Sequence, residues 1–171
     1  MTFDIELLEN RSFTHMAKAT FQSYDSWNEL GEKYQILLQK ALSNQANAYA
    51  PYSNFKVGAA IQLSDGSLVD GFNIENASYP LCVCAERVAI GNALVNGMGK
   101  KIKVLAVIGG TSKTPAFPCG ACRQVMYEME YRQGTPYKVI MASPSGKVIL
   151  VDSPSELLPY SFGPDFLIEK R

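Results

Sequence analysis

The pattern of hydrophobic and polar positions becomes regular at Ser26, and residues 1–25 before it show no clear period. Residues Ser26 to Glu29 form a capping-box pattern, and apolar side chains then recur at helical spacing. This pattern predicts one amphipathic helix that ends near Ala48. We therefore expect residues 1–25 to be an N-terminal extension and residues 26–171 to form a single folded domain.

Further apolar runs predict five strands and two more helices. Residues 55–63 and 68–74 are expected to pair as antiparallel strands, because an Asp-Gly turn signal separates them. A helix over 84–96 is apolar most of the way round, and such a helix is normally buried. The remaining predicted elements are a strand over 103–108, a helix over 120–132, and antiparallel strands over 137–142 and 147–151. This order predicts an α/β fold, a three-layer α/β/α sandwich around a mixed five-stranded sheet.

Charge and hydropathy exclude several classes of partner. The 171 residues carry 16 Lys plus Arg and 16 Asp plus Glu, so no overall basic field attracts the phosphates of nucleic acid. No apolar run reaches the roughly 18–20 residues of a membrane span, and residues 1–9 carry acids where a targeting peptide carries Lys or Arg. We therefore expect a cytoplasmic protein with no nucleic-acid or membrane partner.

Three cysteines stand where two of the predicted helices begin. In a reducing cytoplasm, cysteines serve metal binding or catalysis more often than disulfides. Cys84, Cys119 and Cys122 lie at helix N-termini, where the helix dipole favours the thiolate that zinc binds. Three thiolates leave the fourth tetrahedral position open to water, as in a catalytic zinc site. The Cys-x-x-Cys spacing alone also occurs in redox motifs and in structural zinc sites.

Two neighbours of Cys84 bear on this chemistry. The only histidine is His15, so a general base is expected to be a carboxylate or a metal-bound hydroxide. Glu86, two residues after Cys84, is the candidate carboxylate. Cys82, two residues before Cys84, is interpreted as a packing residue, because a fourth thiolate would close the position that water needs.

Several segments resemble one known family. They are Cys-Ala-Glu-Arg at 84–87, Pro-Cys-Gly-Ala-Cys-Arg-Gln at 118–124, AYAPYSNFKVGAA at 48–60 and FNIENASYP at 72–80, with a weaker match in ELLPYSFGP at 156–164. Together they resemble the zinc-dependent cytidine deaminases, specifically the small homotetrameric type that uses three cysteines. The extra N-terminal segment and a longer connection over 131–137 depart from that pattern. The resemblance implies that residues 26–171 form a cytidine deaminase-like catalytic domain.

The resemblance also implies a role for each residue of the zinc centre. Cys84, Cys119 and Cys122 would hold Zn²⁺, and Glu86 would carry protons between water and the pyrimidine ring. Arg87 would hydrogen-bond to the sulfurs and offset the net negative charge of three thiolates on Zn²⁺. In the same way, Gln124 would support the ligands that precede it.

For the substrate, the resemblance implies that Phe55 is an aromatic platform for the pyrimidine. Asn73 and Glu75 would hold the ribose hydroxyls. Tyr79 and Phe162 would reach into the active site of a neighbouring subunit of a homotetramer. Without the resemblance, Phe55 has the role of a core residue, and Asn73 and Glu75 that of turn residues at the end of a strand. Tyr79 and Phe162 can equally pack on their own chain.

The function implied by these residues is hydrolytic deamination of cytidine and deoxycytidine to uridine and deoxyuridine, with release of ammonia in pyrimidine salvage. One alternative is a deaminase of a modified cytosine nucleoside, such as the blasticidin type, against which the segments at 48–60 and 72–80 argue. Another is a non-catalytic zinc-stabilised or redox module. The open zinc position and the carboxylate of Glu86 beside it disfavour this alternative. A third is a polynucleotide-editing deaminase, which the balanced charge disfavours, as does Cys84 where such enzymes usually have histidine.

Overall fold

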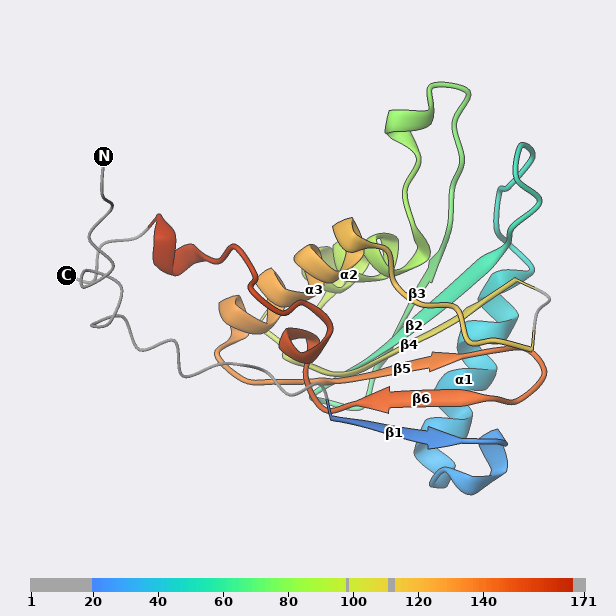
Figure 1. Ribbon diagram of the computed structural model, residues 1–171, viewed down its shortest axis with the longest axis horizontal. Coiled ribbons are helices and arrows are strands. Elements are labelled where there is room, and N and C mark those ends of the chain that lie inside the picture. Colours follow the sequence, from blue (N-terminus) through green and yellow to red (C-terminus); the bar gives the residue numbers. More distant parts are fainter. Residues whose placement is uncertain (1–19, 98, 111–112, 168–171) are drawn as a thin grey trace, which may run out of the picture.

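A mixed sheet with helices on both faces organises the chain (Figure 1). The structure is a computed structural model that describes residues 20–97, 99–110 and 113–167. No helix within these ranges is long and apolar enough to cross a lipid bilayer.

The sheet has six strands in the order β1-β6-β5-β4-β2-β3. Their bounds are β1 Phe21–Tyr24, β2 Val57–Leu63, β3 Leu68–Phe72, β4 Ile102–Gly109, β5 Lys138–Ala142 and β6 Val148–Val151. Only β4 and β5 pair in parallel, and the other neighbouring strands are antiparallel. The predicted antiparallel pairings of β2 with β3 and of β5 with β6 are confirmed.

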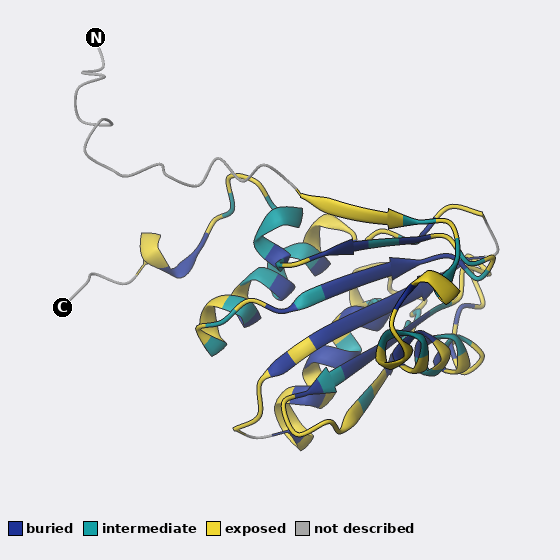
Figure 2. Cartoon of the chain, turned by 90° about the horizontal axis from the view of Figure 1, so that it is seen from below, coloured by how far each residue is buried: buried dark blue, intermediate teal, exposed yellow. Residues whose placement is uncertain are grey.

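The sixth strand is a correction to the five that the sequence predicts. Strand β1 lies within residues 1–25 and pairs antiparallel with β6, with Phe21 opposite Val151. It occupies the sheet edge, and three of its four residues are exposed, as Figure 2 shows. Because only Tyr24 is partly buried against the core, the sequence of β1 carries no alternation of apolar and polar residues. The division into an extension and a catalytic domain stays a prediction.

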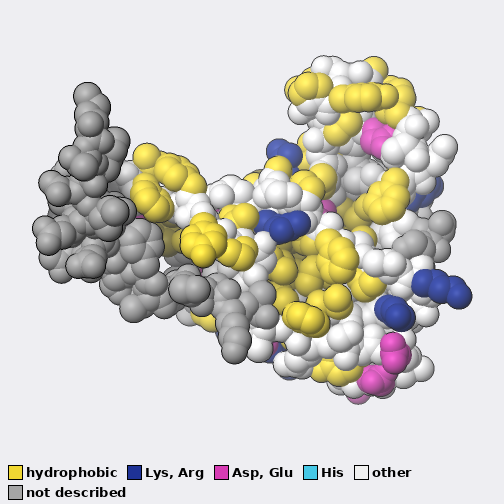
Figure 3. Space-filling view, viewed as in Figure 1, with side chains coloured by type: hydrophobic (Ala, Val, Ile, Leu, Met, Phe, Trp, Pro, Cys, Tyr) yellow, Lys and Arg dark blue, Asp and Glu magenta, His cyan; other side chains and the backbone are white. Residues whose placement is uncertain are grey.

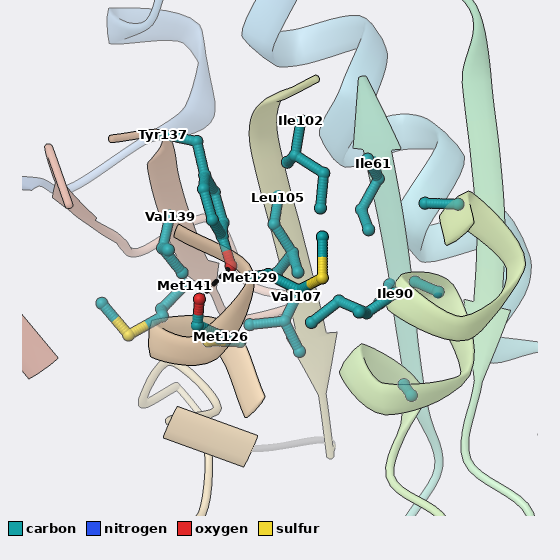
Figure 4. Close-up of a cluster of buried hydrophobic side chains, with 14 of the residues drawn as sticks. Ile61, Ile90, Ile102, Leu105, Val107, Met126, Met129, Tyr137, Val139 and Met141 are labelled. Atoms are coloured by element: carbon teal, nitrogen blue, oxygen red, sulfur yellow. Dashed lines mark hydrogen bonds between the residues drawn. The ribbon is translucent and has the colours of Figure 1, made fainter. Parts of the chain in front are cut away.

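Three helices complete the predicted three-layer sandwich. Helix α1 (Glu32–Gln45) covers one face of the sheet, and α2 (Ala85–Asn96) and α3 (Gly120–Gln133) cover the other (Figure 1). Each helix buries a core against the sheet, as the close-up of the α2 and α3 side in Figure 4 shows. In that core the hydroxyl of Tyr137 donates a hydrogen bond of 2.9 Å to the carbonyl oxygen of Met126. The α/β class and the layer order are confirmed.

The first helix does not begin at Ser26, as the sequence predicts. The capping box at Ser26 is present, but it caps the short 3₁₀ helix η2 (Trp27–Glu29). Leu30 then adopts an extended conformation and is buried, and α1 begins at Glu32 with Gly31 as its N-cap. A capping box fixes only the turn that it caps, so it does not show how far the helix continues.

Helix α2 is less buried than its composition predicts. One side, which includes Ala89 and Ile90, packs into the core. On the other side Leu94 and Val95 are exposed. Periodicity cannot separate these two sides, because apolar residues occupy both.

A glycine in β3 fixes how closely α2 approaches the sheet. A Cβ at Gly71 would lie 2.5 Å from the carbonyl oxygen of Ala85 and 2.6 Å from the backbone nitrogen of Ala89. No real side chain tolerates such distances, so this position requires glycine for the observed packing. This contact sets the distance between β3 and the first turn of α2, where Glu86 lies.

Candidate active site

Three thiols meet where α2 and α3 begin. Cys84 is the N-cap of α2, Cys119 is the N-cap of α3, and Cys122 lies one turn further along α3. The Sγ of Cys119 lies 4.0 Å from that of Cys84 and 3.5 Å from that of Cys122, and all three lie within 4.8 Å of one another. Thiolates about 2.3 Å from a tetrahedral zinc ion lie about 3.8 Å apart, so these three sulfurs fit one zinc ion.

The surroundings of the thiols favour a thiolate. A hydrogen bond from Cys122 lowers the pKa of Cys84 to about 6, and the positive charge of Arg87 contributes. The same hydrogen bond and burial raise the pKa of Cys122. The N-termini of α2 and α3 add partial positive charge at the same place. The cluster therefore carries negative charge near neutral pH, which attracts a cation.

Glu86 is a buried carboxyl group beside the thiols. It lies in the first turn of α2, and only 4% of its surface is exposed. Burial, together with the nearby charge of Cys84, raises its pKa to about 7. A carboxyl group with such a pKa both accepts and releases a proton near neutral pH.

A pocket of about 410 Å³ opens beside Glu86 and the thiols. Its wall comes from the segments 53–57, 73–75, 82–86 and 116–119, together with Val107. Of the residues that the sequence singles out for chemistry, it brings together Phe55, Asn73, Glu75, Glu86, Cys84 and Cys119. Segments that are far apart in the sequence therefore form one site, as the predicted chemistry requires.

Asn73 bonds to the protein backbone on both sides of Lys56. Its Oδ1 accepts a hydrogen bond of 2.7 Å from the Val57 N–H, and its Nδ2 donates one of 2.9 Å to the Phe55 carbonyl oxygen. An amide group has one further hydrogen and further lone pairs to offer. Asn73 therefore has a structural role in the pocket wall.

Glu75 holds the loop that precedes Phe55. Its carboxylate accepts hydrogen bonds from the backbone N–H groups of Tyr52 (2.9 Å) and Ser53 (3.3 Å) and from the Ser53 hydroxyl. These bonds, chiefly that from the Ser53 hydroxyl, lower the pKa of Glu75. The Ser53 Oγ in turn accepts a hydrogen bond of 3.0 Å from the Phe55 N–H.

Ser53 and Phe117 are among the lining residues that were not predicted as site residues. Ser53 lies inside the 48–60 segment, so its place in that segment was the available signal. Phe117 precedes the Pro118-Cys119 motif by one residue, and nothing in its spacing distinguishes it from a core residue.

Besides Cys122, which is buried, four of the predicted site residues lie outside the pocket lining. Tyr79 is 67% exposed, and its ring centroid lies 5.8 Å from that of Tyr52. Phe162 is also exposed and stacks on Phe166 with 5.4 Å between ring centroids. Gln124 donates a hydrogen bond of 2.9 Å to the Phe162 carbonyl oxygen, so it fastens the C-terminal segment to α3.

The fourth is Arg87, which is exposed. Within the residues that the structure describes, it forms no hydrogen bond with a thiol. Its charge still lowers the pKa of Cys84. A direct bond from Arg87 to the sulfurs stays a prediction.

Cys82 borders the pocket without joining the three-thiol cluster. Its Sγ accepts a hydrogen bond of 3.2 Å from the Asn76 N–H, so it helps to close the loop between Ile74 and Val83, which pair with each other. This contact agrees with its interpretation as a packing residue.

A family model of the cytidine and deoxycytidylate deaminase zinc-binding region matches residues 31–136, more than half of the chain. The chain belongs to this family. The matched region contains the three-thiol cluster, and zinc is the metal that this region binds in the family. Zinc is therefore the cofactor that the cluster fits.

Individual relatives agree with the family match. The chain is 44% identical over 128 residues to a cytidine deaminase of Halalkalibacterium halodurans, covering 75% of this chain and 92% of the relative. It is 37% identical to a cytidine deaminase of Mycobacterium tuberculosis, covering 81% and 96%. The crystal structure of a cytidine deaminase from Burkholderia pseudomallei superposes with a TM-score of 0.68 at 43% identity, covering 75% of this chain and 98% of that one.

We expect the purified chain to bind one zinc ion through three sulfurs, because the described cluster contains three thiols. Cys119→Ser should abolish stoichiometric zinc binding, since a hydroxyl is a much poorer zinc ligand than a thiolate. Metal analysis and X-ray absorption spectroscopy measure both quantities. Cys82→Ser is the matched control and should keep its zinc. A shell of four sulfurs, or loss of zinc in Cys82→Ser, would contradict this assignment.

Proposed function

We propose that this chain is a zinc-dependent cytidine deaminase that converts cytidine and deoxycytidine to uridine and deoxyuridine and releases ammonia, a step of pyrimidine salvage. The observation that carries the proposal is the pocket in which a three-thiol cluster adjoins the buried carboxyl group of Glu86. Relatives named cytidine deaminase, at 37–44% identity over most of their length, support the same substrate class. Neither a modified nucleoside nor a non-catalytic role gains support from them. The cytoplasmic location stays a prediction from the sequence.

The zinc ion would be held by Cys84, Cys119 and Cys122, and it supplies a Lewis acid that makes water a stronger nucleophile near neutral pH. The positive ends of α2 and α3 point at the same place and stabilise developing negative charge. In this proposal Arg87 offsets part of the thiolate charge, and Gln124 anchors the C-terminal segment beside the site.

Glu86 would transfer the protons of the reaction. As the water oxygen adds to C4 of the pyrimidine, Glu86 accepts a proton from the water and delivers it to N3. A second proton from the added hydroxyl then passes through Glu86 to the amino nitrogen, the C4–N4 bond breaks, and ammonia leaves. A carboxyl group with a pKa near 7 serves both steps, because it is neither fully ionised nor fully protonated at neutral pH.

The nucleoside itself would lie between Phe55 and the thiol cluster. Phe55 is half exposed and borders the pocket, so its ring offers an apolar surface to the pyrimidine. Glu75 remains ionised because its pKa is lowered, and an ionised carboxylate accepts hydrogen bonds from ribose hydroxyls. Asn73 lies beside it in the pocket wall with one amide hydrogen to spare.

We further propose that the chain acts as a homotetramer. A segment around the 3₁₀ helix η3 (Tyr79–Leu81) projects from the body, and hydrophobic side chains gather on it and along the C-terminal segment (Figure 3). Tyr79, Phe162, Leu94 and Val95 are all exposed in the single chain. Large exposed apolar surfaces of this kind mark sites where another protein surface packs. Neighbouring copies would cover them and bring Tyr79 and Phe162 to one another's sites.

We expect Glu86→Gln to retain zinc and fold but to lose about 10²–10⁴-fold in kcat, since an amide cannot accept the proton. Glu128→Gln is the matched control, because Glu128 is an exposed carboxylate on α3. Steady-state kinetics and metal content report both effects. Near-native turnover by Glu86→Gln would show that another group moves the protons.

Cytidine should be a better substrate than cytosine or CMP by at least about tenfold in kcat/KM. Cytosine has no ribose hydroxyl to form the hydrogen bond proposed for Glu75. CMP brings a phosphate close to Glu75, and the described pocket lining includes no Lys or Arg to receive it. The change in ultraviolet absorbance as each cytosine ring is deaminated measures all three rates. No reaction with cytidine would disprove the proposed function, and a preference for cytosine or CMP would overturn the assignment of Glu75 to the ribose.

Light scattering should give a mass of about 75 kDa, four times the 18.8 kDa of one chain. Tyr79→Ala should reduce both the mass and the activity, because a neighbour's site depends on this residue. Tyr131→Ala is the control, since Tyr131 is exposed on α3 and outside the projecting segments. A fully active monomer would contradict the tetramer.

A further inference from the structure

The backbone around Phe55 is held by hydrogen bonds from three directions. Ser53 accepts from the Phe55 N–H, and Asn73 bridges the Phe55 carbonyl and the Val57 N–H. The third partner is the last residue of α1: the Gln45 Nε2 donates to the Lys56 carbonyl oxygen at 2.9 Å. These hydrogen bonds therefore restrain the position of the Phe55 backbone.

Gln45 also reaches the next segment of the site. The same Nε2 donates to the carbonyl oxygen of Gly110 at 3.0 Å, and the Gly110 N–H donates to the Lys56 carbonyl oxygen at 3.0 Å. One side chain thus ties the segment that carries Phe55 to the chain that leaves β4. These contacts place Gly110 against the Phe55 ring.

The Phe55 ring packs directly on Gly110. A Cβ built on Gly110 would lie 2.7 Å from Cε2 and 3.2 Å from Cζ of that ring. Carbon atoms at rest lie about 3.5–4.0 Å apart, so the ring occupies space that any side chain at this position would need. Gly110 also has a φ of +67°, a conformation that favours glycine. The position of the ring therefore depends on the absence of a side chain at residue 110.

We propose that Gln45 and Gly110 are positioning residues that set how far the Phe55 ring stands into the pocket, and hence the width left for the pyrimidine. The inference rests on the proposed function, in which Phe55 faces the base. A Cβ at residue 110 would have to move the ring by about 1 Å to reach normal contact distance. A displacement of this size at a site that orients a substrate costs up to about 100-fold in rate.

Two glycines allow this effect to be separated from backbone strain. Gly110 and Gly134 both have a φ of +67°, but a Cβ on Gly134 would have no atom within 4 Å. Gly110→Ala and Gly134→Ala should therefore lower the melting temperature through the same left-handed strain. Only Gly110→Ala should raise KM for cytidine and weaken binding of the product uridine, each by about tenfold or more, with a smaller change in kcat.

The contribution of Gln45 is tested by a second matched pair. Gln45 and Gln35 both belong to α1, and each donates its amide to a backbone carbonyl; that of Gln35 bonds to Leu30 at 2.7 Å, at the other end of the helix. Gln45→Ala should raise KM for cytidine by several-fold, whereas Gln35→Ala should leave KM unchanged. If Gly110→Ala does not fold, this pair decides the proposal.

Phe55→Ala provides the deciding test, because both residues are proposed to act through the ring. Kinetics with cytidine and calorimetry with uridine are compared for Gly110→Ala in the native and in the Phe55→Ala background. The effect of Gly110→Ala should disappear in the second background. An equal effect in both backgrounds, or native-like uridine binding by both Gly110→Ala and Gln45→Ala, would overturn the proposal. If the unchanged chain neither binds uridine nor deaminates cytidine, the proposed function fails instead.

Discussion

The meeting of two helix N-termini is the constraint on which the rest of the structure depends. Three sulfurs must come within about 4 Å of one another, and they belong to segments separated by 35 residues of sequence. The sheet solves this by supporting α2 and α3 side by side on one face, with Gly71 allowing the first turn of α2 to lie directly against β3. Burial at this junction raises the pKa of Glu86, and the same helix ends provide partial positive charge for the thiolates.

The opposite wall of the site is built from hydrogen bonds rather than from core packing. The 52–57 segment is held by Glu75, Asn73 and Gln45, whose side chains satisfy its backbone groups. The backbone groups of loops that carry binding residues need such partners, because no neighbouring strand forms hydrogen bonds with them. The residues assigned to the substrate thus also keep the pocket in shape, so their substitution affects both substrate binding and the local fold.

The sequence predicts well the helices and strands that are buried in the two cores, because burial produces the regular spacing of their apolar residues. Apolar spacing predicts the strands β2, β3, β4, β5 and β6 and the helix α3, and a largely apolar composition predicts α2. Strand β1 was missed since its side chains are exposed, and the break after Glu29 was missed because a capping box does not determine the length of the helix that it caps. In the site, short motifs identified the thiols and Glu86, whereas the bonds of Gln45 and the contact of Gly110 with Phe55 depend on tertiary geometry that no local pattern contains.

The pairing of β1 with β6 has a consequence for the order in which the chain folds. Phe21 is opposite Val151, so β1 is synthesised about 130 residues before the strand with which it pairs. During translation β1 has no partner until β6 has left the ribosome, and the edge of β6 is covered last. Loop-closure entropy grows slowly with length, so the late pairing costs little stability but delays completion of the sheet. The edge strand therefore completes the sheet late and joins segments that are far apart in the sequence.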